Sequence, residues 1–572
     1  MVSDARALAT RLADLGDAAL AATLAARGVS AQAGWHDFFD AAESLLESSS
    51  VDRALTRLDR RDLIALRDGR SRADGTASLL ALVDADGAPY AVVAERVAAA
   101  AATSPEAFTP AADEREPAPA EPRSSAGAAE RAFTTAGSLA DVLLACLHAP
   151  LARTGAGPVS AADRRRLMDA GAIEFSDDLE DLLTSAAGAG LAVAHDREWV
   201  VTDLGERWLE APTPQRWEAI AEGLRASLPA GLRTPAGGFA SPASWPTAYP
   251  LDPDWPARAG ELHRLGVRWG LFDPAGAAEF PWTAALRAGE AADAATMAPY
   301  LPAEIDRVYL QADLTAIAPG PLAPALDLRL RSMAARESRA QASTYRFTAA
   351  SLAAGMTEGE TAESMRAFLA SLSLTGIPQP LEYLIESTAA RHGMVRVRAH
   401  EGAGRTRVES PDASLLDAIA IDQALRPLGL VPDGEALTSR VARDAVYWTL
   451  ADARYPVIAL DAAGRPESIH RRTSGTPSEP AATAEQAYAR LIAILRGGHG
   501  TDGEAGWLER ELEQAVRSRA EIIVVVRMPD GAERSFTLEA AGLGGGRLRG
   551  RDRAADIERT LPVSSIVSVG VA

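Results

Sequence analysis

Two stretches of the 572-residue sequence carry no apolar period, and they limit how the chain can fold. Residues 103–131 are rich in Pro, Ala, Glu and Ser, and residues 471–485 are rich in Ser, Thr, Pro and Ala. Segments of this composition bury too little apolar surface to offset chain entropy, so we predict two flexible linkers. At about 100–200 residues per domain, the rest of the chain is expected to form several domains.

The segment before the first linker is predicted to be helical, and the segment after it follows the order of a winged helix. Apolar residues recur at helical spacing in 5–24 and 50–66. After residue 132, three helical stretches precede two short strands at 191–194 and 199–202, which is the order of a winged helix with its wing. Residues 231–300 are interpreted as a connector, with a short strand at 267–272 that indicates a second winged-helix half.

The remaining sequence alternates strand and helix and ends in short strands. Strands and helices alternate through 301–400 and again through 401–470. Five short strands follow residue 521, and Asp530-Gly531 favours a hairpin turn between the first two. This pattern predicts a small C-terminal β-barrel.

The predicted fold class is multi-domain α+β. The predicted segments are a helical N-terminal domain (1–102), a linker (103–131), a winged-helix domain (132–230), a connector with a second winged-helix half (231–300), an α/β domain (301–400), a second α/β segment (401–470), a linker (471–485) and a C-terminal β-barrel module (486–572).

Residue types that are absent exclude several chemistries. All 58 basic residues are Arg, so no phosphate-loop lysine and no Schiff-base lysine exist. The single cysteine, Cys146, excludes intrachain disulfides and zinc sites with two or more thiolates. The eight histidines are scattered, and the sequence has no GxGxxG, GxSxG or HExxH motif. We expect no catalytic residues, no metal and no cofactor, although a Ser-His-Asp set assembled by the fold stays open.

The sequence also bears on the location of the protein. Met1 to Leu15 lacks an apolar core and a cleavage site, so no signal peptide is expected. No run approaches the roughly 18 apolar residues that a membrane helix needs, so we expect no membrane partner. The predicted location is cytoplasmic, and one thiol fits a reducing compartment.

Arginine-rich segments stand out because the formal net charge is −20. Phosphate binding depends on clustered cations, so local patches matter more than the total. Residues 51–72 carry seven Arg and four Asp, and residues 391–407 carry five Arg and one Glu. Arginines also alternate through 547–553, and on a strand alternate residues share a face. The alternative is a solvated surface in a chain whose only cation is Arg. The residues predicted to bind nucleic acid are Arg391, Arg396, Arg398, Arg405, Arg407, Arg547, Arg549 and Arg551.

The predicted winged-helix domain has the opposite charge. Residues 173–206 contain nine acidic residues and one Arg, and four of the acids lie at 177–181, in the expected recognition helix. A helix that reads DNA needs positive charge. We therefore predict a packing or protein-binding role for this unit.

Three segments carry a resemblance to a known family. They are VYLQADLTAIAPGPL (308–322), STYRFTAASL (343–352) and SLTGIPQPLEYLIESTAARHGMVRV (373–397). In this order they resemble the N-terminal domain of XPB-type DNA helicases, as found in actinobacterial helicase-associated proteins. The C-terminal module is similar to a WYL-like domain, without the Trp-Tyr-Leu signature.

The resemblance implies a domain that engages DNA and partner proteins beside two motor lobes. This chain lacks the phosphate-loop lysine, a DEAH-like box and room for two lobes. We therefore expect a non-enzymatic, DNA-associated accessory protein in DNA repair or transcription, with DNA and a helicase, nuclease or transcription-repair protein as partners. The alternatives are a protein-interaction scaffold that docks through the acidic unit and a ligand-sensing regulator that acts through the C-terminal barrel. If the three arginine sets form one continuous stripe on the surface, DNA binding is favoured. If they are scattered over the surface, the scaffold is favoured.

Overall fold

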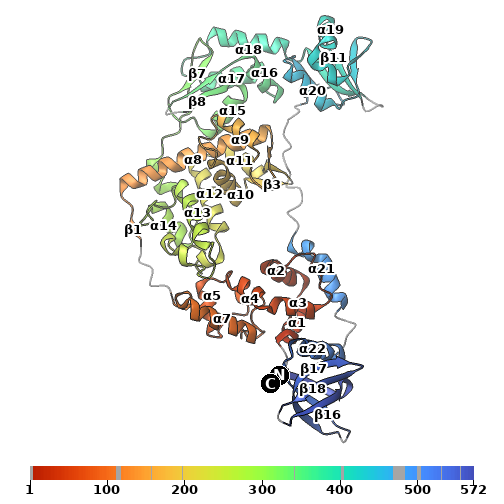
Figure 1. Cartoon of the computed structure of the whole chain (residues 1–572). Helices are drawn as coiled ribbons and strands as arrows, with labels where there is room; N and C mark the ends of the chain where they lie inside the picture. The colour runs from red at the N-terminus through yellow and green to blue at the C-terminus, as the bar shows by residue number, and fades with distance from the viewer. Residues whose placement is uncertain are drawn as a thin grey trace.

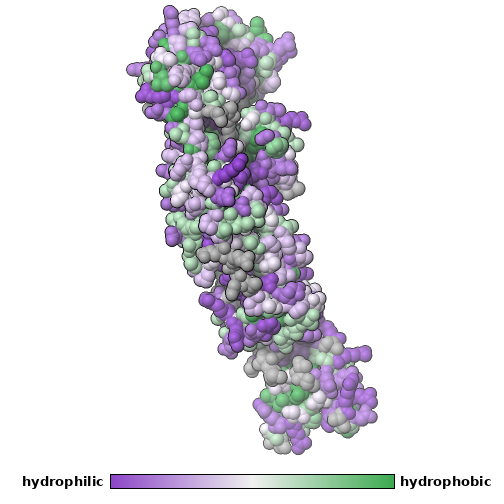
Figure 2. Space-filling model, turned by 90° about the vertical axis from the view of Figure 1, so that its left-hand side faces the viewer, coloured by the Kyte–Doolittle hydropathy of each residue, from purple (hydrophilic) through white to green (hydrophobic). Residues whose placement is uncertain are grey.

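The computed structural model describes residues 4–571 apart from 111–116, 156, 196, 340–341, 401–404, 465, 468–482, 499–503, 530 and 554. Helices and small sheets alternate along these residues, so the predicted mixed α+β class is confirmed. The molecule is elongated, as two perpendicular views show (Figures 1 and 2). Among the described helices, none has the length and apolar character needed to cross a membrane.

The N-terminal core is helical, as predicted, but both helices expected there are interrupted. A break at Leu15-Gly16 separates α1 from α2. Asp59 caps α5 by accepting a hydrogen bond from the Asp62 amide at 2.8 Å, which ends the preceding helical segment. The helices are α1 (Asp4–Asp14), α2 (Asp17–Arg27), α3 (Phe38–Leu46), α4 (Ser48–Leu55), α5 (Arg60–Arg67), α6 (Thr76–Leu79) and α7 (Ala91–Thr103).

Helix α21 (Ala484–Gly498) completes this core although it lies far away in the sequence. Its residues Tyr488, Leu491, Ile492 and Leu495 are buried in this core, and the Tyr488 hydroxyl donates to the Val29 carbonyl at 2.5 Å. The Arg496 guanidinium also pairs with Asp17 at 3.1 Å. The helix predicted to begin the C-terminal module therefore belongs to the N-terminal core. Of the linker predicted at 471–485, residues 471–482 lie outside the described part of the structure.

The linker predicted at 103–131 contains ordered elements. The short helix η1 (Pro105–Phe108) buries Phe108, and helix α8 (Pro122–His148) starts inside the predicted linker. Ala128 and Ala129 of α8 are fully buried. The composition hid this helix because small side chains pack closely without producing a strong apolar period.

The region predicted as a winged helix has the expected order of elements. The β3–β4 hairpin occupies the position predicted for the wing, and the sheet order is β2-β4-β3. The assignment to the winged-helix class stays a prediction. The elements are β2 (Leu151–Ala152), α9 (Ala161–Asp169), α10 (Asp178–Gly188), β3 (Ala192–His195), β4 (Glu198–Val201), α11 (Asp203–Glu210) and α12 (Thr213–Ser227).

The strand predicted at 267–272 is wrong. Helix α13 (Trp255–Arg268) runs into it, and the next residue, Trp269, is buried with its indole N–H on Ser185 Oγ at 2.8 Å. The apolar residues predicted to form a strand of the wing therefore form the end of α13 and the buried contact of Trp269. One buried cluster holds residues from α8 through α14 (Pro281–Ala288), so the two segments predicted at 132–230 and 231–300 share a core.

A four-stranded antiparallel sheet follows, in the order β6-β7-β9-β8. The buried faces of four helices and the sheet form one core that includes Tyr345 and Phe347. The elements are β6 (Tyr309–Leu310), β7 (Thr315–Ala318), α15 (Pro324–Met333), β8 (Ala335–Arg339), β9 (Ser343–Arg346), α16 (Ala349–Thr357), α17 (Ala362–Leu372) and α18 (Gln379–Arg391).

A six-stranded sheet comes next, in the order β12-β13-β11-β10-β14-β15. Its strand β10 (Val395–His400) pairs with β11 (Arg405–Glu409), so the predicted boundary between residues 400 and 401 falls between two paired strands. The other elements are α19 (Ala413–Ile421), β12 (Val431–Asp433), β13 (Ala436–Ser439), α20 (Arg443–Asp452), β14 (Val457–Leu460) and β15 (Pro466–Glu467).

The C-terminal sheet is open, which corrects the predicted barrel. Its order is β19-β18-β17-β16-β20, and the described edge strands β19 and β20 do not pair with each other. The long strand β17 pairs first with β16 and then with β18, with an irregular register between Ala540 and Gly542. This bend curves the sheet without closing it. The elements are α22 (Glu504–Ser518), β16 (Glu521–Arg527), β17 (Glu533–Gly544), β18 (Arg547–Asp552), β19 (Ile557–Pro562) and β20 (Ile566–Val571).

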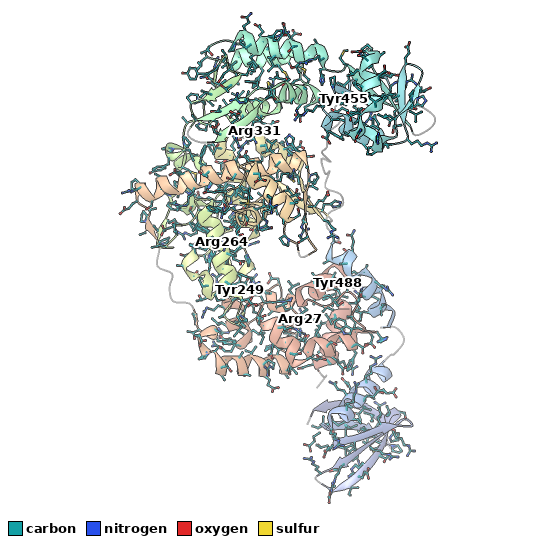
Figure 3. All side chains as sticks on the ribbon, turned by 45° about the horizontal axis from the view of Figure 1, so that its top comes forward. Arg27, Tyr249, Arg264, Arg331, Tyr455 and Tyr488 are labelled. Atoms are coloured by element: carbon teal, nitrogen blue, oxygen red, sulfur yellow. The ribbon has the colours of Figure 1, made fainter. Side chains whose placement is uncertain are left out.

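A buried ionic cluster joins α8 to the four-stranded unit. The Asp141 carboxylate is 3% exposed, accepts from Arg331 at 2.6 Å and also pairs with Arg336. Asp327 completes the cluster, because it lies 3.6 Å from Arg331 and accepts the Tyr345 hydroxyl at 2.5 Å. Figure 3 places Arg331 at this junction. Removing one partner would leave buried charge unpaired, so the junction depends on the complete set.

We expect Asp141→Ala to destabilise the junction by about 3–5 kcal/mol, because two partly buried guanidiniums would lose their carboxylate. Urea unfolding measures the loss in the free energy of unfolding, and hydrogen exchange in α8 and α15 shows whether the loss is at this junction. The control is Asp74→Ala, which breaks an exposed pair with Arg72 and is expected to leave stability nearly unchanged. Equal effects of the two substitutions would contradict the role of the cluster.

Candidate nucleic-acid interface

Arginines gather on one face of the six-stranded sheet. The antiparallel register places Arg398 opposite Arg407 and Arg396 opposite Glu409, and residues paired in this way share a face. Val395 and Val397, which alternate with these arginines, are buried in the core that contains α19 and α20. The prediction that Arg396 and Arg398 share a face is therefore confirmed.

Acidic side chains neutralise part of this arginine face. Glu409 Oε1 lies 2.9 Å from Arg398 Nη2 and 2.7 Å from Arg407 Nε. The hydrogen bond from Arg398 is the main reason that the pKa of Glu409 is lowered. Arg407 also reaches Asp433 at 3.1 Å. Arg396 is exposed, donates to the Gly393 carbonyl at 3.3 Å and has no ion pair among the described residues.

The two other arginines predicted in this segment flank the face. Arg391 is the last residue of α18, is exposed, and donates from Nε to the carbonyl of Ser387 in its own helix at 3.1 Å. Arg405 begins β11 opposite His400, and its side chain lies outside the described part of the structure. The guanidinium of Arg391 is therefore available at the edge of this unit.

The C-terminal arginines also share one face of a strand. Arg547, Arg549 and Arg551 are exposed on β18, while the residues between them are buried. Arg551 pairs with Asp556 at 2.6 Å, and its neighbour across the ladder is Glu558. This face is therefore less positive than the spacing of its arginines indicates.

The arginine sets do not merge into one stripe. The strands β10 and β18 belong to different sheets, and Figure 1 shows these sheets at opposite ends of the molecule. The set at 51–72 lies in the N-terminal helices, where Arg67 donates to the Phe108 carbonyl at 2.9 Å and Arg57 donates to the Ala26 carbonyl. Each set is therefore a separate local surface.

The acids of helix α10 are engaged inside the molecule. Asp178 pairs with Arg268 at 2.6 Å, and Asp181 pairs with Arg264 at 3.2 Å, both on α13. Glu180 pairs with Arg164 at 3.0 Å. Helix α10 is therefore held against neighbouring helices and is not a free recognition helix.

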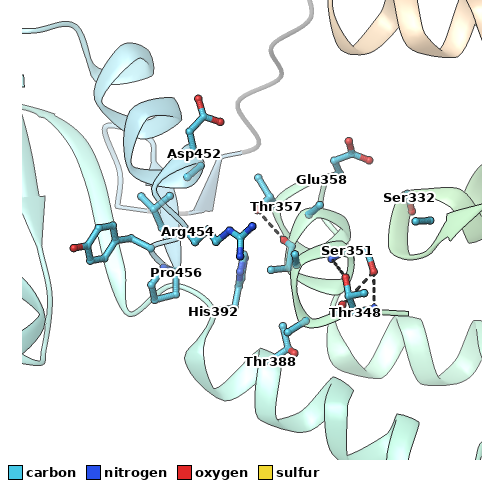
Figure 4. Close-up of a pocket in the computed structure, with 18 of the residues that line it drawn as sticks. Ser332, Thr348, Ser351, Thr357, Glu358, Thr388, His392, Asp452, Arg454 and Pro456 are labelled. Atoms are coloured by element: carbon cyan, nitrogen blue, oxygen red, sulfur yellow. Dashed lines mark hydrogen bonds between the residues drawn. The ribbon is translucent and has the colours of Figure 1, made fainter. Parts of the chain in front are cut away.

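A groove that the sequence did not reveal runs between the two α/β units. Its volume is about 1020 Å³, and residues of α16, α18 and the turn after α20 line it, together with the end of α8 and part of α9. Figure 4 shows the Arg454 side chain extending from the turn after α20 toward His392 and Thr357. Burial lowers the pKa of His392. The walls come from segments that are distant in the sequence, so the sequence alone could not reveal the groove. The one local signal was Arg454, an arginine two residues after the end of α20.

Among the described residues, no group of three or more His, Cys, Asp or Glu side chains is placed to hold a metal ion. Burial raises the pKa of the Cys146 thiol to about 11, so the unreactive thiol form dominates at neutral pH.

Part of the chain matches a known protein family. The family described as "Helicase conserved C-terminal domain" matches residues 308–432, which span the four-stranded unit and the strands β10–β12. This part of the chain is therefore linked to helicase-related proteins. Arg391, Arg396, Arg398, Arg405 and Arg407 lie inside the match. No curated protein matches the chain.

Proposed function

We propose that this protein is a non-enzymatic, DNA-associated accessory protein that acts in DNA repair or transcription. The observation that carries the proposal is the arginine face of β10 and β11, inside the segment related to helicases. A guanidinium can bind two phosphate oxygens at once, and Arg396 has no carboxylate competing for it among the described residues. DNA, together with a helicase, nuclease or transcription-repair protein, is the partner that this function requires.

The charge of the chain limits how DNA binds. A net charge of −20 repels phosphate over most of the surface, so binding is confined to local positive faces. Glu409 and Asp433 hold Arg398 and Arg407 in place and reduce their net charge. The expected interaction is therefore weak, sensitive to salt and independent of base sequence.

A motor activity is not part of the proposal. The sequence has no lysine for a phosphate loop, so ATP hydrolysis of the helicase type lacks its usual cation. The kinship that we propose is with the accessory N-terminal domain of XPB-type helicases. This protein would then position DNA or a partner while another protein supplies the motor.

A protein-interaction scaffold is the second candidate, because the arginine sets are scattered. The acidic winged-helix unit was its predicted docking site. The ion pairs of Asp178, Glu180 and Asp181 within the molecule leave fewer free carboxylates for a partner. Regulation by a ligand of the C-terminal sheet has no comparable feature to support it.

Replacing Arg396 and Arg398 by Ala is expected to weaken DNA binding and to reduce the dependence of log K on log salt by about 1.8, because each phosphate contact contributes about 0.9. Titration of duplex and forked DNA from about 50 to 200 mM salt measures this slope. The matched control is Arg547→Ala with Arg549→Ala, two exposed arginines at the same strand spacing. A larger loss in the control pair would move the interface to the C-terminal sheet and contradict the proposal.

Glu409→Gln is expected to strengthen DNA binding, because it removes the carboxylate that Arg398 and Arg407 share while keeping the side-chain size. The slope of log K against log salt should become steeper, since more positive charge meets phosphate. Asp556→Asn, which frees Arg551 in the same way, is the control. Unchanged or weaker binding by the Glu409→Gln variant would argue against this face.

A further inference from the structure

We propose that the groove between the two α/β units binds a single strand of nucleic acid. The inference rests on the proposed function and assigns a second surface to it. The groove has one end that carries two arginines and another end formed by a helix N-terminus. Helix α16 separates them, and its nine residues span roughly 13 Å at 1.5 Å per residue. A ligand with several anionic groups along its length fits this arrangement better than one free phosphate.

One end of the groove carries free guanidiniums. Arg454 lines it and makes no ion pair among the described residues, and Arg391 lines it from the end of α18. Arg454 has φ +63°, the left-handed conformation that a helix end usually gives to Gly. A bulky residue costs stability in that position.

The other end of the groove is the N-terminus of α16. Thr348 and Ser351 form a capping box, with both amide-to-hydroxyl distances at 3.0 Å, and the exposed Ala349 and Ala350 complete the first turn (Figure 4). Backbone N–H groups and the helix dipole favour an anion at such a terminus. Arg166 also lines the groove and pairs with Asp163 at 2.9 Å.

A buried hydroxyl between the ends gives independent evidence for a ligand. Thr388 lines the groove from α18 and is 5% exposed, and its Oγ1 has no hydrogen-bond partner among the residues that the structure describes. An unsatisfied buried hydroxyl costs about 1–3 kcal/mol, so a polar ligand that reaches it would remove a penalty already present in the fold.

The remaining walls suit nucleotide bases. Trp448 and Tyr455 are half-buried residues of the lining, and aromatic side chains are the type on which bases stack without sequence preference. Glu358 and Asp452 also line the groove and oppose phosphate near the C-terminal end of α16. The volume of about 1020 Å³ is close to the upper size of a small-molecule pocket, which admits a few nucleotides and excludes a duplex.

The test compares Arg454→Gly with Arg519→Gly by fluorescence anisotropy, using a labelled oligothymidylate and a duplex of equal length. Arg519 is exposed with φ +49° and lies between α22 and β16, outside the groove. Both substitutions should keep or raise stability, because Gly adopts this conformation freely. Arg454→Gly is expected to raise the Kd for the single strand on the order of tenfold, and Arg519→Gly should leave it unchanged.

A second variant tests the groove without changing the charge of the protein. Thr388→Val removes the unpartnered hydroxyl at equal size, so stability should be kept while affinity for the single strand falls. Single-strand binding that is unchanged in both Arg454→Gly and Thr388→Val overturns the groove, even if the Arg396 and Arg398 substitutions still weaken duplex binding. Absence of any DNA binding by the unaltered protein would instead defeat the proposed function itself.

Discussion

The ionic cluster around Asp141 fixes the geometry of the groove. It connects the end of the long helix α8 to α15 and β8 of the four-stranded unit. The groove takes His148 and Arg166 from the first side of this junction, and its other walls from the second side. Because a buried charge cluster tolerates little displacement, the junction holds these walls in register.

Arginine serves structure and surface in the same molecule. Several guanidiniums are buried and donate to backbone carbonyls, as Arg27 does to Leu80 at 2.9 Å and Arg216 does to Trp208 at 3.0 Å. Burial lowers the pKa of each of these two side chains to about 10, which still leaves them charged at neutral pH. The exposed arginines that make no ion pair among the described residues, including Arg396 and Arg454, are available to a ligand. Counting charge along the sequence could not separate these two groups.

The sequence predicted the strands and the shared faces better than the domain borders. Alternation in β10 and β18 identified the arginine faces correctly because strand periodicity is a local property. The return of α21 to the N-terminal core, the start of α8 inside a predicted linker and the open C-terminal sheet depend on contacts between distant segments. The groove was missed for the same reason. Its key residues, Thr388 and Arg454, acquire meaning only when α18 and the turn after α20 lie side by side.

The most direct test of the account is photo-crosslinking of bound DNA followed by identification of the crosslinked peptides. The account predicts crosslinks in the segment that holds Arg391 to Glu409 from duplex and single strands, and near Arg454 and Thr388 from single strands only. Crosslinks confined to β18 or to the helices α4 and α5 would contradict it. Such a result would place the DNA on a part of the chain unrelated to the helicase match.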